Sequence, residues 1–233
     1  MEKQLIDILS LDLPAFVVGI GFHEFCHAFA ADRLGDPTPR QNGRVSLNPI
    51  EHLDPLGTFL PLYLSLVGSP MAFGWGKPVE VNPNNFKDPV KGYGIVAFAG
   101  PLGNLLVAAL IGLFLSISPG NEMLLKAMTT PTGNFFYRLL FRVFGMNLGL
   151  FLFNLLPIPP LDGSKVLMWL GGPSVKTKIE AIQPYSLFIL ILFISAKLDV
   201  KLLVPLYVKM TFILTGPMAG YIFDPGQFVA NFL

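Results

Sequence analysis

Long apolar stretches constrain this chain more than any other feature of its sequence. A helix needs about 20 mostly apolar residues to cross the hydrocarbon core of a bilayer, and stretches near that length recur along the chain. Only 13% of the residues are charged, whereas soluble domains average about 25%. The sequence therefore predicts an all-α polytopic membrane protein that forms a single domain over residues 1–233.

We predict about five transmembrane helices and one shorter apolar segment. The segment 56–71 is short for a crossing and contains Pro61, Gly68 and Pro70, so we expect it to be re-entrant or interfacial. Lys209 lies near the middle of the last expected helix and is interpreted as snorkelling or facing the bundle. The expected transmembrane helices are 13–31, 94–117, 139–156, 181–196 and 202–223.

Two runs between the first two apolar helices alternate in polarity and end in Asn-Pro. They span residues 44–49 and 78–83, and the pattern is typical of short β-strands stopped by proline. The alternative is a pair of unrelated loops that end in common turn residues. The first interpretation places short strands near the membrane face.

A His-Glu-x-x-His pattern lies inside the first apolar helix, at His23, Glu24 and His27. Residues four apart on a helix share one face, so both imidazoles can reach one metal ion. Zinc accepts such ligands and lowers the pKa of a bound water to about 7, and Glu24 is placed to act as the general base. The alternative is packing in a core, but ionisable groups within a membrane span usually mark function. We therefore predict one Zn2+ per chain.

A catalytic zinc site needs a third protein ligand and an open position. Asp162 is the favoured candidate because it follows a span broken by prolines, where freed backbone and an acidic side chain suggest a site. Its alternative role is an ordinary turn with Gly163. His52 lies in a polar stretch and is expected to be a loop residue or the partner of a ligand. Cys26, the only cysteine, is an alternative fourth ligand, although a lone cysteine is more often a small buried residue.

These motifs together resemble the site-2 protease family of intramembrane zinc metalloproteases. That family joins an HExxH helix to a second helix with an NxxPxPxxDG-type motif, which residues 154–163 match here. Further segments, 35–38, 43–49, 74–79 and 99–104, resemble its compact prokaryotic branch, which lacks a PDZ domain. The likeness covers about residues 13–170, which we take as the catalytic core, followed by C-terminal helices over 181–223. The departures are Cys26, where a smaller residue is usual, and Ser164-Lys165, where Gly-Arg often follows.

The resemblance implies a role for several residues. His23, His27 and Asp162 would ligate zinc and Glu24 would be the base. Asn104 and Asn154 would lie near the site, as donors to the oxyanion or to a ligand, although asparagine also commonly links membrane helices. A possible substrate-binding strand consists of Arg44, Val45, Ser46, Leu47 and Asn48, which would hold an unwound substrate by β-augmentation.

One geometric requirement fixes the expected topology. If His27 and Asp162 bind the same ion, the first and third apolar helices run parallel, with one crossing between them, so 56–71 does not cross. Nine Lys and Arg residues would then lie on the zinc side against six opposite, which favours a cytoplasmic position for that side. The implied location is a prokaryotic plasma membrane.

The expected activity is hydrolysis of peptide bonds within or near transmembrane segments of membrane-anchored proteins. The partners would be such a substrate and the lipid bilayer, and the net charge of +1 gives no basic field for nucleic acid. Two alternatives remain open from the residues: another membrane zinc peptidase, such as a prenyl-protein protease, and a non-enzymatic membrane protein that binds or transports metal.

Overall fold

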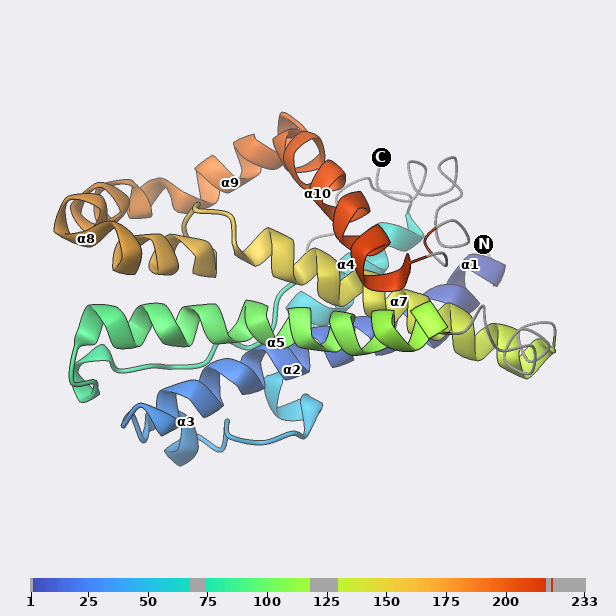
Figure 1. Cartoon of the computed structure of the whole chain (residues 1–233), viewed down its shortest axis with the longest axis horizontal. Coiled ribbons are helices and arrows are strands. Elements are labelled where there is room, and N and C mark those ends of the chain that lie inside the picture. The colour runs from blue at the N-terminus through green and yellow to red at the C-terminus, as the bar shows by residue number, and fades with distance from the viewer. Residues whose placement is uncertain (1, 68–73, 118–129, 217–218, 220–233) are drawn as a thin grey trace.

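The structure, a computed structural model, describes residues 2–67, 74–117, 130–216 and 219, and over these residues the chain is helical (Figure 1). A π-helical turn, Ile8–Asp12, joins α1 to α2 without a break in the helix. The α-helices are α1 (Glu2–Asp7), α2 (Leu13–Arg33), α3 (Thr38–Gln41), α4 (Pro55–Leu66), α5 (Pro89–Ile117), α7 (Pro131–Asn154), α8 (Asp162–Ile182), α9 (Ser186–Ser195) and α10 (Leu198–Thr215).

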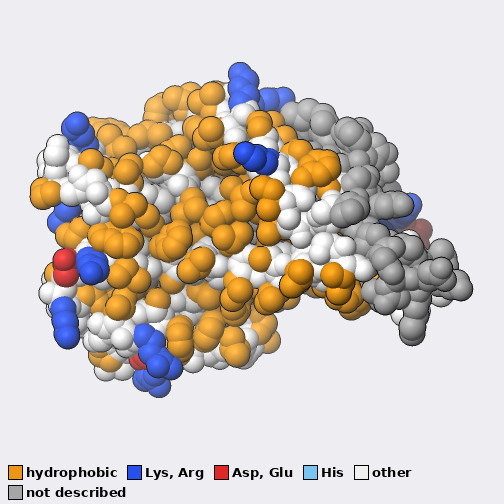
Figure 2. Space-filling view, viewed as in Figure 1, with side chains coloured by type: hydrophobic (Ala, Val, Ile, Leu, Met, Phe, Trp, Pro, Cys, Tyr) orange, Lys and Arg blue, Asp and Glu red, His pale blue; other side chains and the backbone are white. Residues whose placement is uncertain are grey.

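Four helical runs among the described residues are long and apolar enough to cross a membrane: Glu2–Arg33, Pro89–Ile117, Pro131–Asn154 and Asp162–Ser195. Hydrophobic side chains also cover most of the face seen in Figure 2, while Lys and Arg gather mainly at the end where α8 lies. The predicted all-α architecture is confirmed over the described residues, with helices suited in length and composition to crossing a membrane. The expected count of five is not reached in the described part. The helix expected over 202–223 begins as α10, but residues 217–218 and 220–223 lie outside the described residues.

The fourth run differs from the expected helix over 181–196. It begins at Asp162 and bends sharply at Gly172, whose φ is 72° and ψ is −168°. Glycine tolerates this conformation because it has no Cβ, and Pro173 is well suited to start the helix that follows. Figure 1 shows the chain turning back on itself within α8. Residues 181–196 are therefore the end of a bent helical run.

Three helices, α2, α5 and α7, pack side by side through small residues and a buried apolar core. A Cβ on Gly19 of α2 would lie 2.8 Å from Leu150 of α7, and one on Gly103 of α5 would lie 2.4 Å from the Cys26 sulfur. Such small residues let membrane helices approach closely. In Figure 1, α2 and α7 run in the same direction and α5 runs against them. This is the arrangement that a shared ion requires.

The residues that precede and follow the segment containing α4 lie next to each other. Leu53 and Gly76 form an isolated antiparallel bridge, and the Lys77 N–H donates to the carbonyl of His52 at 2.8 Å. Twelve residues of helix measure about 18 Å, against a hydrocarbon core of about 30 Å. Because residues 53 and 76 are adjacent, the segment between them makes no net crossing. This agrees with a re-entrant or interfacial segment, although residues 68–71 lie outside the described part.

The two short strands predicted over 44–49 and 78–83 are not present, and the described residues contain no strand. Around the first run, hydrogen bonds between side chains and the backbone occur in place of the backbone hydrogen bonds of a sheet. The Arg44 side chain turns inward and donates to the carbonyl of Lys77, the His52 ring bonds the carbonyl of Ser46 at 2.7 Å, and Asn48 donates its N–H to the Ser46 hydroxyl at 3.1 Å. These local bonds favour irregular turns over an extended edge. Residues 44–48 therefore offer no regular strand to a substrate.

Asp36 ties the loop after α2 to the loop before α5. Its buried carboxylate accepts hydrogen bonds from the Thr38 N–H and hydroxyl, from the Asn82 N–H, and from the Asn85 side chain, at 2.6 to 3.1 Å. Burial alone would raise the pKa of Asp36, but these hydrogen bonds favour the charged form and leave the pKa below its ordinary value. The ionised carboxylate therefore stabilises the folded state.

Replacing Asp36 by alanine is expected to lower the free energy of unfolding at pH 7 by about 2–4 kcal/mol, because hydrogen bonds to a buried charge are lost. Since the folded pKa is depressed, the difference from wild type should be full above about pH 5 and should shrink as the pH falls below about 4. Thermal unfolding of the purified protein in detergent at several pH values measures this. The matched control is Glu51→Ala at an exposed position. Equal stability of Asp36→Ala and Glu51→Ala at pH 7 would contradict the prediction.

Candidate metal centre

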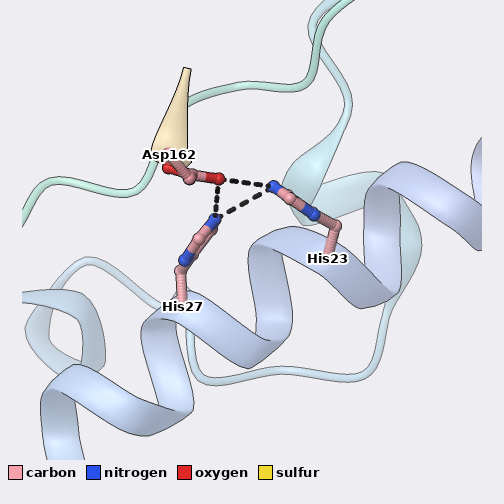
Figure 3. Close-up of side chains that lie close together, drawn as sticks. All are labelled: His23, His27 and Asp162. Carbon is pink, nitrogen blue, oxygen red and sulfur yellow. Dashed lines mark hydrogen bonds and ion pairs between the residues drawn. The ribbon is translucent and has the colours of Figure 1, made fainter. Parts of the chain in front are cut away.

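Three side chains from two distant parts of the chain converge inside the helix bundle (Figure 3). His23 and His27 lie one turn apart on α2, and Asp162 is the first residue of α8. Their exposed fractions are only 4%, 8% and 6%. The Nε2 atoms of the two imidazoles and one oxygen of Asp162 point to a common centre. The structure thus brings together the three residues predicted to bind the metal.

The spacing of these three atoms suits a zinc ion. The two Nε2 atoms are 3.0 Å apart, and Asp162 Oδ2 lies 3.2 Å from His23 Nε2 and 3.1 Å from His27 Nε2. Tetrahedral zinc, with bonds of about 2.0–2.2 Å, sets its ligand atoms roughly 3.4 Å apart. Two imidazoles and one carboxylate form a donor set that zinc accepts, and three protein ligands leave one position open. The residues present therefore fit a catalytic zinc ion.

Hydrogen bonds at the far side of each ring determine which nitrogen faces the centre. His27 Nδ1 lies 2.7 Å from the backbone oxygen of Val96, and His23 Nδ1 lies 2.7 Å from Oδ1 of Asn104. Both oxygens can only accept, so each Nδ1 carries the proton and donates it. Each Nε2 then presents a lone pair to the centre, which is the form that a metal ligand needs.

Gly100 of α5 lets the backbone of that helix lie directly against the two imidazoles. A Cβ at this position would be 2.3 Å from His27 Nε2 and 2.8 Å from His23 Cε1. Real contacts never come so close, so any side chain here would displace the ligand rings. The Gly100-Pro101 pair of the sequence is therefore part of the site itself.

Gly163 and Lys165 hold Asp162 in place. A Cβ on Gly163 would lie 2.2 Å from the carbonyl oxygen of Leu155, so only glycine allows α8 to start against the end of α7. Lys165 Nζ donates to the second carboxylate oxygen, Oδ1 of Asp162, at 3.1 Å, and also lies 5.5 Å from the centre of the Tyr93 ring. One oxygen of Asp162 is thus turned to the imidazoles and the other to Lys165.

Glu24 is half-buried beside the centre, next to the loop that contains Gly76, where an added Cβ would lie 3.1 Å from Glu24 Cγ. Among the described residues, no hydrogen bond or ion pair engages its carboxylate, so the oxygens are free to accept a proton. Arg44 is a nearby positive charge. Burial lowers the pKa of the Arg44 guanidinium, and the charge of Glu24 partly offsets this. Arginine nonetheless stays protonated in proteins.

Comparison with known proteins places this geometry in a family. "Putative zinc metalloprotease YwhC" of Bacillus subtilis (strain 168) is 39% identical over 203 residues, which cover 84% of this chain and 86% of that protein. The chain belongs to the family of site-2 protease-like zinc metalloproteases. "Putative zinc metalloprotease Rip2" of Mycolicibacterium smegmatis is 26% identical over 196 residues, 83% of this chain and 70% of that protein. No family model matches the chain, and no solved structure matches it.

The other residues that the sequence suggested for the site of this metalloprotease differ in whether they contact the three converging side chains. Asn104 is fully buried and bonds His23, as described above. Asn154 is half-buried and donates to the carbonyl of Leu150 in its own helix at 3.1 Å. His52 is buried in the loop near Arg44, and Cys26 packs on Gly103. Among the described residues, neither joins the group of side chains that could hold a metal ion.

Sequence reasoning missed three groups that support the centre of the metalloprotease, either directly or through a neighbouring residue. The first is the backbone carbonyl of Val96, which no side-chain pattern can reveal. The second is Lys165, which the sequence shows only as a departure from a Gly-Arg pair. The third is Asn147, which is fully buried and accepts a hydrogen bond at 2.9 Å from the Asn104 amide. An asparagine inside an apolar run of α7 was the available signal for it.

Proposed function

We propose that this metalloprotease hydrolyses peptide bonds within or near transmembrane segments of membrane-anchored proteins. The observation that carries the proposal is the position of His23, His27 and Asp162, which converge inside helical runs that are long and apolar enough to cross a membrane. Ionisable groups at such positions usually serve function. A metal centre buried among these helices is suited to a substrate that is itself embedded in the bilayer.

Each residue of the centre has a role in the proposed hydrolysis. Zinc, when bound, supplies Lewis acidity that polarises the substrate carbonyl and activates water. Glu24 accepts the proton of the attacking water and delivers it to the leaving amine, as a general base that becomes a general acid. Lys165 and the helix start at Gly163 keep the Asp162 carboxylate turned to the imidazoles. A helical substrate must unwind locally, because its carbonyls are otherwise bonded within the helix.

The proposal extends to placement and partners. The metalloprotease would be a compact prokaryotic site-2 protease without a PDZ domain, resident in the plasma membrane. Its metal centre would lie nearer the cytoplasmic face, which is supported by the Lys and Arg residues gathered at the α8 end of the molecule (Figure 2). Its partners would be lipid and a membrane-anchored substrate.

Metal removal tests this proposal on native substrates. Membranes from cells that produce the chain are incubated with and without 1,10-phenanthroline, and new protein termini are mapped by mass spectrometry. We expect new termini within apolar segments, their loss with the chelator and their return on addition of Zn2+. Membranes from cells without the chain are the control.

Two other results would overturn the proposal. Cleavage confined to the last residues of prenylated proteins would indicate a prenyl-protein protease. Metal uptake without any new terminus would indicate a protein that binds or transports metal.

A further inference from the structure

A chain of hydrogen bonds crosses three helices behind His23. Its Nδ1 lies 2.7 Å from Asn104 Oδ1 on α5. The Asn104 amide nitrogen donates at 2.9 Å to the carbonyl of Gly19 on α2 and at 2.9 Å to Oδ1 of Asn147 on α7. The Asn147 amide nitrogen donates in turn to the carbonyl of Val143 at 2.8 Å. Both asparagines are fully buried.

The hydrogen bonds run in a single direction, because the two backbone carbonyls at the far end, those of Gly19 and Val143, can only accept. The Val143 carbonyl requires the NH2 group of Asn147, which leaves Oδ1 of Asn147 for the next residue. Gly19 and Asn147 then both require the NH2 group of Asn104, which leaves Oδ1 of Asn104 for His23. The proton of the His23 ring is consequently held on Nδ1, and the lone pair of Nε2 faces the metal-binding centre.

Turning the Asn104 amide over would set its oxygen against two acceptors, Gly19 O and Asn147 Oδ1. It would also set its NH2 group against the protonated Nδ1 of His23. Without Asn147, only Gly19 would oppose that flip, and one buried N–H of Asn104 would lack a partner. An unpaired buried donor is costly. Asn147 therefore adds to the preference of Asn104 for the orientation that suits a metal ligand.

We propose that Asn147 is a positioning residue of the metal centre, which acts through Asn104 to hold His23 in its metal-binding form. The inference rests on the zinc site proposed above, but not on the substrate or the cleavage reaction. Residues beyond the direct ligands typically change metal affinity about 10–100-fold. Because Asn147 is one step further out than Asn104, we expect a loss near the lower end of that range.

Two substitutions that are isosteric with each other, to valine and to threonine, test whether hydrogen bonding at position 147 matters. Asn147→Val removes both hydrogen bonds. Asn147→Thr introduces a hydroxyl that can donate to the Val143 carbonyl, as the Thr211 hydroxyl does to the Tyr207 carbonyl at 2.9 Å, and that can accept from Asn104. The metal probe is Co2+ added to the purified metal-free chain, followed by its visible absorption. Competition with a chelator gives the affinity.

We expect Asn147→Val to weaken Co2+ binding about 10-fold and to alter the absorption bands, and Asn147→Thr to recover much of the loss. With Asn104→Leu already present, adding Asn147→Val should weaken binding no further, because Asn147 acts through Asn104. The matched control is Thr211→Val, which also replaces a buried polar side chain by an apolar one but lies on α10, and it should leave affinity unchanged. Melting temperatures of all variants separate a loss of stability from a loss of affinity.

Three results would overturn the inference. One is unchanged Co2+ affinity and absorption in Asn147→Val. Another is an additive loss in the double variant, which would show that Asn147 acts independently of Asn104. The third is failure of the wild-type chain to bind Co2+, which would remove the metal site itself. Binding of Co2+ without any proteolysis would overturn only the proposed cleavage reaction.

Discussion

Replacing Glu24 by glutamine is expected to abolish peptide cleavage while leaving zinc bound. Glutamine keeps the size of the side chain but cannot take a proton, and Glu24 is not one of the three converging residues. A positioned general base typically contributes about 10²–10⁴-fold to the rate, so cleavage should fall by at least that order. Metal content by elemental mass spectrometry and the cleavage rate of a membrane-anchored substrate measure the two effects separately.

The control for this change is Glu51→Gln, on the exposed turn beside His52. It makes the same chemical change in the same region and should leave both zinc content and cleavage intact. Cleavage by Glu24→Gln at a rate close to that of wild type would assign the base elsewhere. Loss of zinc together with activity would show instead that Glu24 is needed to assemble the centre.

Replacing Asp162 by alanine is expected to remove zinc as well as activity. The carboxylate is the only oxygen-donating group among the three converging side chains, and its Oδ2 lies 3.1–3.2 Å from both imidazole nitrogens. Losing a direct ligand should weaken binding by more than the roughly 10–100-fold that loss of an outer partner causes. Zinc content after purification and the affinity for added Co2+ provide the measurement.

Asp88→Ala is the matched control, because Asp88 is an exposed aspartate just before α5. It should bind metal as the wild-type chain does. Retention of zinc by Asp162→Ala would point to a different third ligand, as in a prenyl-protein protease that uses glutamate or histidine. Lys165→Met makes a useful companion, since it releases only the second oxygen of Asp162 and should have a smaller effect.

The local part of the site could be predicted from the sequence because it depends on one helix. His23, Glu24 and His27 owe their geometry to the i, i+4 repeat, which any α-helix imposes. Asp162 required more, namely a carboxylate placed where prolines end an apolar helix. The parallel course of α2 and α7 then followed from the need to bring both parts to one ion, and Figure 1 shows that course.

The supporting contacts depend on how helices rotate and approach each other, which one sequence does not reveal. Asn147 and Asn154 are both asparagines on α7 and both donate to a carbonyl four residues earlier. Only Asn147 also reaches α5. The sequence alone offered no basis for preferring it, and the resemblance drew attention to Asn154 instead.

The failed strand predictions have a different cause. Alternation of polarity over 44–49 and 78–83 suggested edges of a sheet, but the inward side chains around the first run are polar. Arg44 and His52 are buried and bond backbone carbonyls across the loop. The first run therefore reflected a loop with a polar interior, whereas the second turns Val81 toward the apolar cluster of Ala31, Phe86 and Val96 without forming a strand. The bend at Gly172 was similarly marked by Gly-Pro, yet its sharpness depends on a positive φ that composition does not fix.

The position of Asp162, the proposed third ligand, has a consequence for biosynthesis. His27 and Asp162 are 135 residues apart in the chain, and α5 and α7 lie between them. A nascent chain that has emerged only as far as α5 carries both imidazoles and the glutamate, but it lacks the carboxylate. The centre is therefore incomplete until α7 is inserted and the first turn of α8 has docked. With the proposed ligands, an unfinished chain would therefore lack protease activity in the membrane into which it is inserted.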